Sequence, residues 1–166
     1  MRDKHLRRIS YLRLSVTDRC NLRCSYCMPA EGLPTFKRED LLKRQEIVTI
    51  ARLAVNSGIR KIRVTGGEPL IRPEIIELLG ELGALPDLER LVVTTNGLLL
   101  DTLAAAVKKA GVSGANISLD SLNSGLYRDI TRGGDLDRCL AGIAASLAVD
   151  LRTKINVVVM AGVNDH

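Results

Sequence analysis

The chain has 166 residues, 46% of them apolar and 26% charged, a composition that fits one domain with a sizeable core and excludes a disordered chain. No run approaches the roughly 18–20 apolar residues of a membrane span and no apolar signal segment follows the basic N-terminus, so we expect a cytoplasmic protein with no membrane partner. One Phe, three Tyr and no Trp argue against nucleic-acid binding, and the net charge of +5 fits an anionic small substrate as well as an unpartnered basic surface.

Runs rich in Val, Ile and Leu alternate along the chain with stripes of helical periodicity. The predicted strands are residues 11–17, 61–65, 90–95, 115–119 and 154–160, and we expect them to be buried on both faces. Helical stripes lie within residues 47–55, 75–82, 103–107 and 136–147, with Asp101 and Asp135 as expected N-caps of the last two. This order predicts a parallel α/β sheet with right-handed crossovers, either part of a barrel or an open doubly wound sheet.

Three cysteines, Cys20, Cys24 and Cys27, follow the first predicted strand within eight residues. Iron–sulfur clusters are held by cysteine thiolates, four for one cubane, so a trio holds three irons and leaves one open to bind a small molecule. A zinc site lacks a second ligand pair, because the only histidines, His5 and His166, lie near the two ends. A thioredoxin-type redox pair leaves Cys20 unexplained. The trio therefore favours an iron–sulfur cluster over both alternatives.

Polar and glycine residues follow the next three predicted strands. They are Thr65-Gly66-Gly67-Glu68-Pro69, Thr94-Thr95-Asn96-Gly97 and Ser118-Leu119-Asp120-Ser121. The carboxyl ends of parallel strands meet at one edge of a sheet, where such folds place their chemistry. The sequence thus predicts a site at this edge. The fourth cysteine, Cys139, lies in a helical stripe and is expected to be a small buried apolar residue.

Two motifs together resemble the radical S-adenosylmethionine (SAM) superfamily. One is Cys-x-x-x-Cys-x-x-Cys with an aromatic residue, Tyr26, before its last cysteine; the other is Gly-Gly-Glu-Pro after the second strand. From residue 11 to the end, runs such as Thr-Asp-Arg-Cys-Asn-Leu-Arg-Cys-Ser-Tyr-Cys-Met-Pro and Lys-Ile-Arg-Val-Thr-Gly-Gly-Glu-Pro-Leu look like the molybdenum-cofactor biosynthesis protein A family, the GTP 3′,8-cyclases. The resemblance implies a partial TIM-type (β/α) barrel with parallel strands inside and helices outside.

The resemblance also implies a lyase reaction. The three cysteines would hold a 4Fe–4S cluster whose open iron binds the amino and carboxylate groups of SAM. An electron from a reducing donor would cleave SAM to a 5′-deoxyadenosyl radical, which takes the C3′ hydrogen of GTP. A new bond to C8 then gives (8S)-3′,8-cyclo-7,8-dihydroguanosine 5′-triphosphate, which a downstream enzyme of molybdopterin biosynthesis uses.

Matching positions give the expected binding residues. For SAM, Tyr26 would contact the adenine, Gly66 and Gly67 would allow close approach, and Glu68 would accept from the amine. Ser118 would hydrogen-bond SAM and Asp120 a ribose hydroxyl, although turn chemistry explains both residues too. Arginine forks and lysine charges suit a triphosphate. The residues expected to bind GTP are Arg13, Lys61, Arg63, Thr94 and Lys154. Charges inside apolar strands would point into a barrel, with a salt-bridged strand edge as the alternative.

One departure from the family concerns length. Its members are about twice as long and carry a second three-cysteine cluster in their C-terminal half. We therefore expect residues 1–166 to form one truncated radical SAM core of about five βα units, without the C-terminal cluster domain. A homodimer is a further expectation. Two alternatives stay open: a radical SAM enzyme with another substrate, and a non-catalytic module that binds the cluster and SAM.

Overall fold

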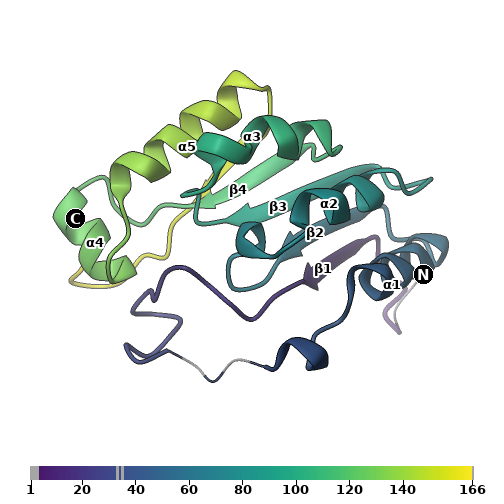
Figure 1. Ribbon diagram of the computed structural model, residues 1–166, viewed down its shortest axis with the longest axis horizontal. Coiled ribbons are helices and arrows are strands. Elements are labelled where there is room, and N and C mark those ends of the chain that lie inside the picture. The colour runs from purple at the N-terminus through teal and green to yellow at the C-terminus, as the bar shows by residue number, and fades with distance from the viewer. Residues whose placement is uncertain (1–3, 33, 35, 166) are drawn as a thin grey trace.

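The computed structural model describes residues 4–32, 34 and 36–165, so that His166 lies outside the described residues. Its centre is a five-stranded parallel sheet with the strands in chain order (Figure 1). The strands are β1 (Tyr11–Ser15), β2 (Lys61–Thr65), β3 (Arg90–Thr95), β4 (Gly114–Ser118) and β5 (Arg152–Asn156). A doubly wound sheet reverses its strand order at a switch point, whereas a TIM-type barrel does not. The sequential order therefore identifies part of a TIM-type barrel and confirms the predicted fold class.

One helix follows each of the first three strands, and two follow β4. They are α1 (Arg44–Asn56), α2 (Ile75–Gly83), α3 (Leu100–Lys109), α4 (Ser124–Thr131) and α5 (Leu136–Ala148), with short 3₁₀ turns η1 (Arg38–Asp40) and η2 (Pro69–Ile71). Helices α1, α2, α3 and α5 cover one face of the sheet, while α4 lies beyond the carboxyl ends of the strands (Figure 1). Among the described helices, none has both the length and the apolar character needed to cross a bilayer.

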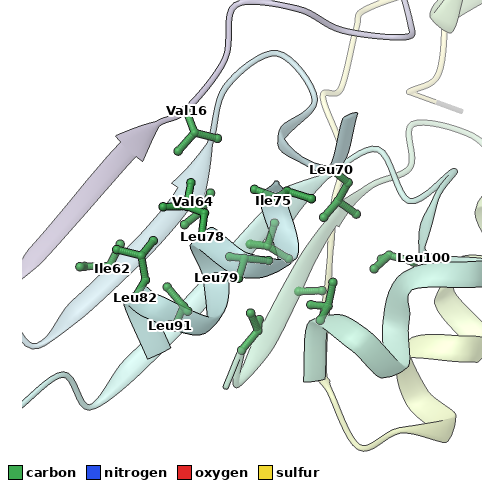
Figure 2. Close-up of a cluster of buried hydrophobic side chains, with 14 of the residues drawn as sticks. Val16, Ile62, Val64, Leu70, Ile75, Leu78, Leu79, Leu82, Leu91 and Leu100 are labelled. Carbon is green, nitrogen blue, oxygen red and sulfur yellow. The ribbon is translucent and has the colours of Figure 1, made fainter. Parts of the chain in front are cut away.

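The core lies between the sheet and its helices. Figure 2 shows side chains of α2, such as Leu78 and Leu82, against Ile62 and Val64 of β2. All four are fully buried, and each such side chain contributes roughly 1.5–3 kcal/mol by leaving water. Burial on both faces, however, was a wrong expectation for β1, β2 and β5. In β2 buried and partly exposed residues alternate, because no helix covers the second face.

The last strand also differs from its prediction, since it runs from Arg152 to Asn156 rather than over residues 154–160. Within the described part of the chain it pairs with β4 alone, and β4 ends where Ser118 pairs with Asn156. Beyond that point the Val158 amide donates to the Asp120 carboxylate, so the chain leaves the ladder despite its valines. The apolar pattern alone did not reveal where the partner strand stops.

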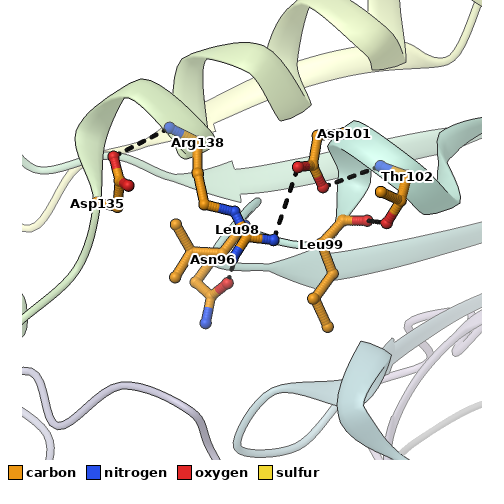
Figure 3. Close-up of polar contacts among 7 residues, drawn as sticks. All are labelled: Asn96, Leu98, Leu99, Asp101, Thr102, Asp135 and Arg138. Carbon is orange, nitrogen blue, oxygen red and sulfur yellow. Dashed lines mark hydrogen bonds and ion pairs between the residues drawn. The ribbon is translucent and has the colours of Figure 1, made fainter.

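The starts of two helices also show how far a local sequence pattern predicts the structure (Figure 3). Asp135 is the N-cap of α5, and its carboxylate accepts from the Arg138 amide at 3.2 Å, as predicted. Asp101 is not a cap, because α3 begins at Leu100, so that Leu99 is the N-cap and Asp101 is the second residue of the helix. The Asp101 carboxylate instead pairs with the Arg138 guanidinium at 3.6 Å and so joins α3 to α5.

Candidate functional site

The three predicted cluster ligands lie on the segment that leaves β1 at the carboxyl edge of the sheet. The amides of Cys27 and Met28 both donate to the Cys24 carbonyl at 3.1 Å, which makes residues 24–27 a tight turn. The Leu22 amide donates to the Cys20 sulfur at 3.4 Å. Cys20 and Cys24 are half-buried, Cys27 is exposed, and all three are free thiols. The segment therefore presents three sulfurs at the edge where the sequence predicted the site.

The donor chemistry of this trio fits three corners of a 4Fe–4S cluster. Burial raises the pKa of the Cys24 thiol to about 11, and the nearby thiols of Cys27 and Cys20 add to that rise. Bound iron would offset the cost of burying a charged thiolate, because metal binding displaces the thiol protons. Within the described residues, no three His, Cys, Asp or Glu side chains lie close enough together to hold a single metal ion. A cluster places its ligands on separate irons and does not require such a grouping.

The Gly66-Gly67 turn after β2 lies directly against the segment that leads to the cysteines. The Gly67 amide donates to the Thr17 carbonyl at 2.9 Å and the Glu68 amide to the Arg19 carbonyl at 2.8 Å. A Cβ on Gly66 would come within 2.5 Å of the Thr17 oxygen, and one on Gly67 within 2.2 Å of the Arg19 oxygen. Glycine is thus needed for contact within the chain. Close approach to SAM stays a prediction.

Glu68 points into the protein and is only 1% exposed. Its Oε1 accepts from the Leu70 amide at 3.0 Å and the Thr95 hydroxyl at 2.8 Å, and its Oε2 accepts from the Asn96 amide at 2.7 Å. Burial raises the pKa of this carboxyl, and the three donors counter the rise in part. The carboxylate therefore joins two loops of the site edge, while Oε2 retains room for one more donor. A SAM amine as that donor stays a prediction.

Tyr26 and Asp120, two predicted SAM contacts, meet each other. The Tyr26 hydroxyl donates to Asp120 Oδ2 at 2.9 Å, and the Val158 amide donates to Oδ1 at 2.8 Å. Burial and then this hydrogen bond raise the pKa of the Tyr26 phenol. Asp120 thus fastens the cysteine segment to the end of β4, where the partly buried Ser118 also lies. Their roles toward SAM stay predictions.

Cys139 is fully buried among the core residues, as predicted. Its sulfur lies 3.4 Å from the Asn96 carbonyl oxygen. It lies on α5 and packs against the loop after β3.

All five residues expected to bind GTP lie on the uncovered face of the sheet. Arg13 pairs in register with Arg63, and Lys61 shares their face because it is two residues away. Thr94 and Lys154 both pair with Asn116 of β4, on the same face. A concavity of about 560 Å³ opens on this face, lined by Lys61, Arg63 and Lys154 but not by Arg13 or Thr94.

The concavity also includes six polar residues that sequence reasoning missed: the cations Arg90 and Arg152, the acidic Glu89, and the neutral Ser113, Asn116 and Thr153. A signal was available for Arg90, which lies two residues before Val92 and therefore on the same face of its strand. Arg152 was missed because the last strand was predicted to start two residues too late.

The electrostatics of this face favour an anion. Arg63 Nε and Thr94 Oγ1 are buried without a hydrogen-bond partner in the described chain. The Lys61 ammonium and the Arg63 guanidinium lie 5.0 Å and 5.6 Å from the centre of the Tyr11 ring. Within the described residues, no ion pair neutralises the six cationic side chains of the face. These six are Arg13, Lys61, Arg63, Arg90, Arg152 and Lys154. Arg13, Arg90, Arg152 and Lys154 are exposed, so water solvates them. The two buried orphan groups, Arg63 Nε and Thr94 Oγ1, cost free energy unless a bound partner satisfies them.

Comparison with known proteins adds independent findings. The family model of the radical SAM superfamily matches residues 14–166. The GTP 3′,8-cyclase of Geobacter sulfurreducens is 57% identical over 98% of this chain and 50% of its own length. The cyclase of Moorella thermoacetica is 51% identical over 99% of this chain and 51% of its own length. The chain thus spans about half the length of the curated relatives it matches.

Solved structures show the same fold at low sequence identity. SuiB of Streptococcus suis superposes with a TM-score of 0.74 at 22% identity, over 92% of this chain and 33% of SuiB. Methylornithine synthase (PylB) superposes with a TM-score of 0.70 at 14% identity, over 92% of this chain and 45% of that protein. At such identities the likeness concerns the fold alone.

Proposed function

We propose that this chain, which belongs to the radical SAM superfamily, is the part of a GTP 3′,8-cyclase that binds the cluster, SAM and the triphosphate of GTP. The observation that carries the proposal is the uncovered sheet face, where unpaired cations lie beneath the edge that bears the three thiols. Identity of 57% to one cyclase and 51% to another supports the same substrate. The whole reaction, the first step of molybdopterin biosynthesis, is proposed for a protein of the relatives' full length.

Radical SAM enzymes use a 4Fe–4S cluster and SAM. The bound cluster supplies the electron that cleaves SAM, and the protein supplies binding, orientation and exclusion of water. In the proposal Cys20, Cys24 and Cys27 bind three irons. The other contacts to SAM are assigned to Tyr26, Gly66, Gly67, Glu68, Ser118 and Asp120. The hydrogen bond between Tyr26 and Asp120 holds the cysteine segment against the end of β4, which orders both side chains before SAM arrives.

The triphosphate is assigned to Arg13, Lys61, Arg63, Thr94 and Lys154, whose shared face supports this role. Arg63 precedes Gly66 by three residues, which corresponds to about 10 Å along a strand. An elongated nucleotide bridges such a distance, with its phosphates on the cations and its ribose near the thiols. In this arrangement the cations that bind the phosphates lie apart from the ribose carbon that reacts. An external reducing donor and a downstream molybdopterin enzyme are proposed partners, and a cytoplasmic homodimer stays a prediction.

The test begins with anoxic reconstitution of the chain with iron and sulfide. We expect a brown protein whose colour and SAM cleavage are both lost in Cys24→Ser, because a hydroxyl does not replace a thiolate ligand. Cys139→Ala is the matched control and should keep both properties, since Cys139 lies in the core. Cleavage retained in Cys24→Ser would contradict the assignment of the cluster. Iron binding without SAM cleavage in the wild type would favour a non-catalytic module.

A further inference from the structure

The C-terminal end of α4 holds the cysteine segment in place. The Arg23 amide donates to the Thr131 carbonyl at 3.2 Å, and the Ser25 amide donates to the Ile130 carbonyl at 2.8 Å. Both carbonyls belong to the last turn of the helix, where backbone acceptors lack partners within the helix. These two bonds attach the backbone on both sides of Cys24 to a helix more than 100 residues later in the chain.

Arg132, the residue after α4, completes this attachment with its side chain. Its Nη1 donates to the Arg23 carbonyl at 3.2 Å and to the Met28 carbonyl at 2.6 Å. Arg23 directly precedes Cys24, and Met28 directly follows Cys27. One guanidinium nitrogen therefore joins the two ends of the tight turn that carries two of the three thiols.

The backbone of Arg132 adopts a conformation that glycine would adopt at lower cost. Its φ of 53° lies in the left-handed region, which residues other than glycine rarely adopt. Glycine is the usual residue at such a helix end, and Gly133 and Gly134 follow immediately. An arginine thus occupies a position that favours glycine by conformation. Such local strain persists where the surrounding contacts stabilise it, and it is concentrated at functional sites.

We propose that Arg132 is a positioning residue for the cluster, because it joins the two ends of the turn that carries Cys24 and Cys27. The inference rests on the proposed cluster site and names a residue that the cysteine motif does not contain. Without the guanidinium, the Arg23 and Met28 carbonyls turn to water and the turn between them opens. The thiolates then hold iron less tightly, although none of them has changed.

The experiment compares the rate at which a chelator removes iron from anoxically reconstituted proteins. Arg132→Gln should release iron roughly 10–100 times faster than the wild type, the usual effect of losing a group that orients metal ligands. Arg128→Gln is the matched control. It removes the same charge one turn earlier, in α4 itself, at an exposed side chain with no hydrogen bond or ion pair in the described structure, and should match the wild type.

A second variant separates positioning from folding. Arg132→Gly relieves the left-handed backbone, so the melting temperature of the iron-free chain should stay the same or rise. Its iron release should nevertheless be as fast as in Arg132→Gln, and this divergence is not expected of a merely structural residue. The inference would be overturned if Arg132→Gln released iron within twofold of the wild-type rate. It would also be overturned if Arg128→Gln released iron as fast as Arg132→Gln. Both outcomes would leave the cluster site intact. A wild-type chain that binds no iron would overturn the cluster site itself, and the inference with it.

Discussion

Replacing Glu68 by Gln tests how the site edge is held together. The side chain keeps its size and loses its charge at a position that is 1% exposed. The carboxylate accepts from the Leu70 amide, the Thr95 hydroxyl and, on its other oxygen, the Asn96 amide. An amide has only one acceptor oxygen, so in either orientation its NH₂ group faces at least one buried donor.

The expected magnitude follows from these contacts. A hydrogen bond to a charged group contributes about 1.5–3 kcal/mol, and a buried donor left unpaired costs about 1–3 kcal/mol. Part of this loss is offset because a neutral amide is easier to bury than a carboxylate. We therefore expect the free energy of unfolding to fall by about 2 kcal/mol, which lowers the melting temperature by about 4–8 °C in a chain of this size.

Urea denaturation of the iron-free chain, followed by circular dichroism, measures the effect. Glu77→Gln is the control, since Glu77 is an exposed carboxylate of α2 and its loss should change stability by less than about 0.5 kcal/mol. If Glu68→Gln were as stable as the wild type, the three donors would contribute nothing net. The explanation of the buried carboxylate as a link between loops would then be refuted.

Two further predictions concern the glycine turn and the cationic face. Gly67→Ala should destabilise the chain by about 1–3 kcal/mol, because the new Cβ would lie 2.2 Å from the Arg19 carbonyl oxygen. Gly80→Ala, in α2 with no atom within 4 Å of the new Cβ, should stabilise it by about 0.5–1 kcal/mol in the same denaturation assay. Arg13→Ala should weaken GTP binding roughly tenfold or more in calorimetry, through one lost charged contact, yet spare SAM cleavage without substrate. Unchanged GTP affinity would remove Arg13 from the substrate site.

Local sequence patterns predicted the central strands well. The bounds of β2 and β3 agree with the predicted residues 61–65 and 90–95, because each apolar run is followed by a polar or glycine-containing turn. β5 was misplaced because an edge strand ends where its partner ends, and this partner is distant in the chain. Periodicity describes one segment at a time, whereas a strand end depends on two.

In the candidate site, too, the sequence predicted the parts but not the contacts between them. The cysteine spacing and the turns after the strands predicted that its parts lie at one edge of the sheet. Their connections were not visible, because the Tyr26 and Asp120 side chains meet across 94 residues and Arg132 reaches Met28 across 104. No local pattern encodes such contacts.

The sequence by itself determined the chemistry that is present: three thiolates, glycines where backbones approach, and cations within apolar strands. Only the tertiary structure decided where that chemistry points. It left one sheet face uncovered, so that the cations of β2 and β5 share a concave surface with Arg90 of β3. It also turned Glu68 and Asp120 toward partners in the chain. The physical reason is that residue type sets what a group can bind, while packing sets which partners it meets.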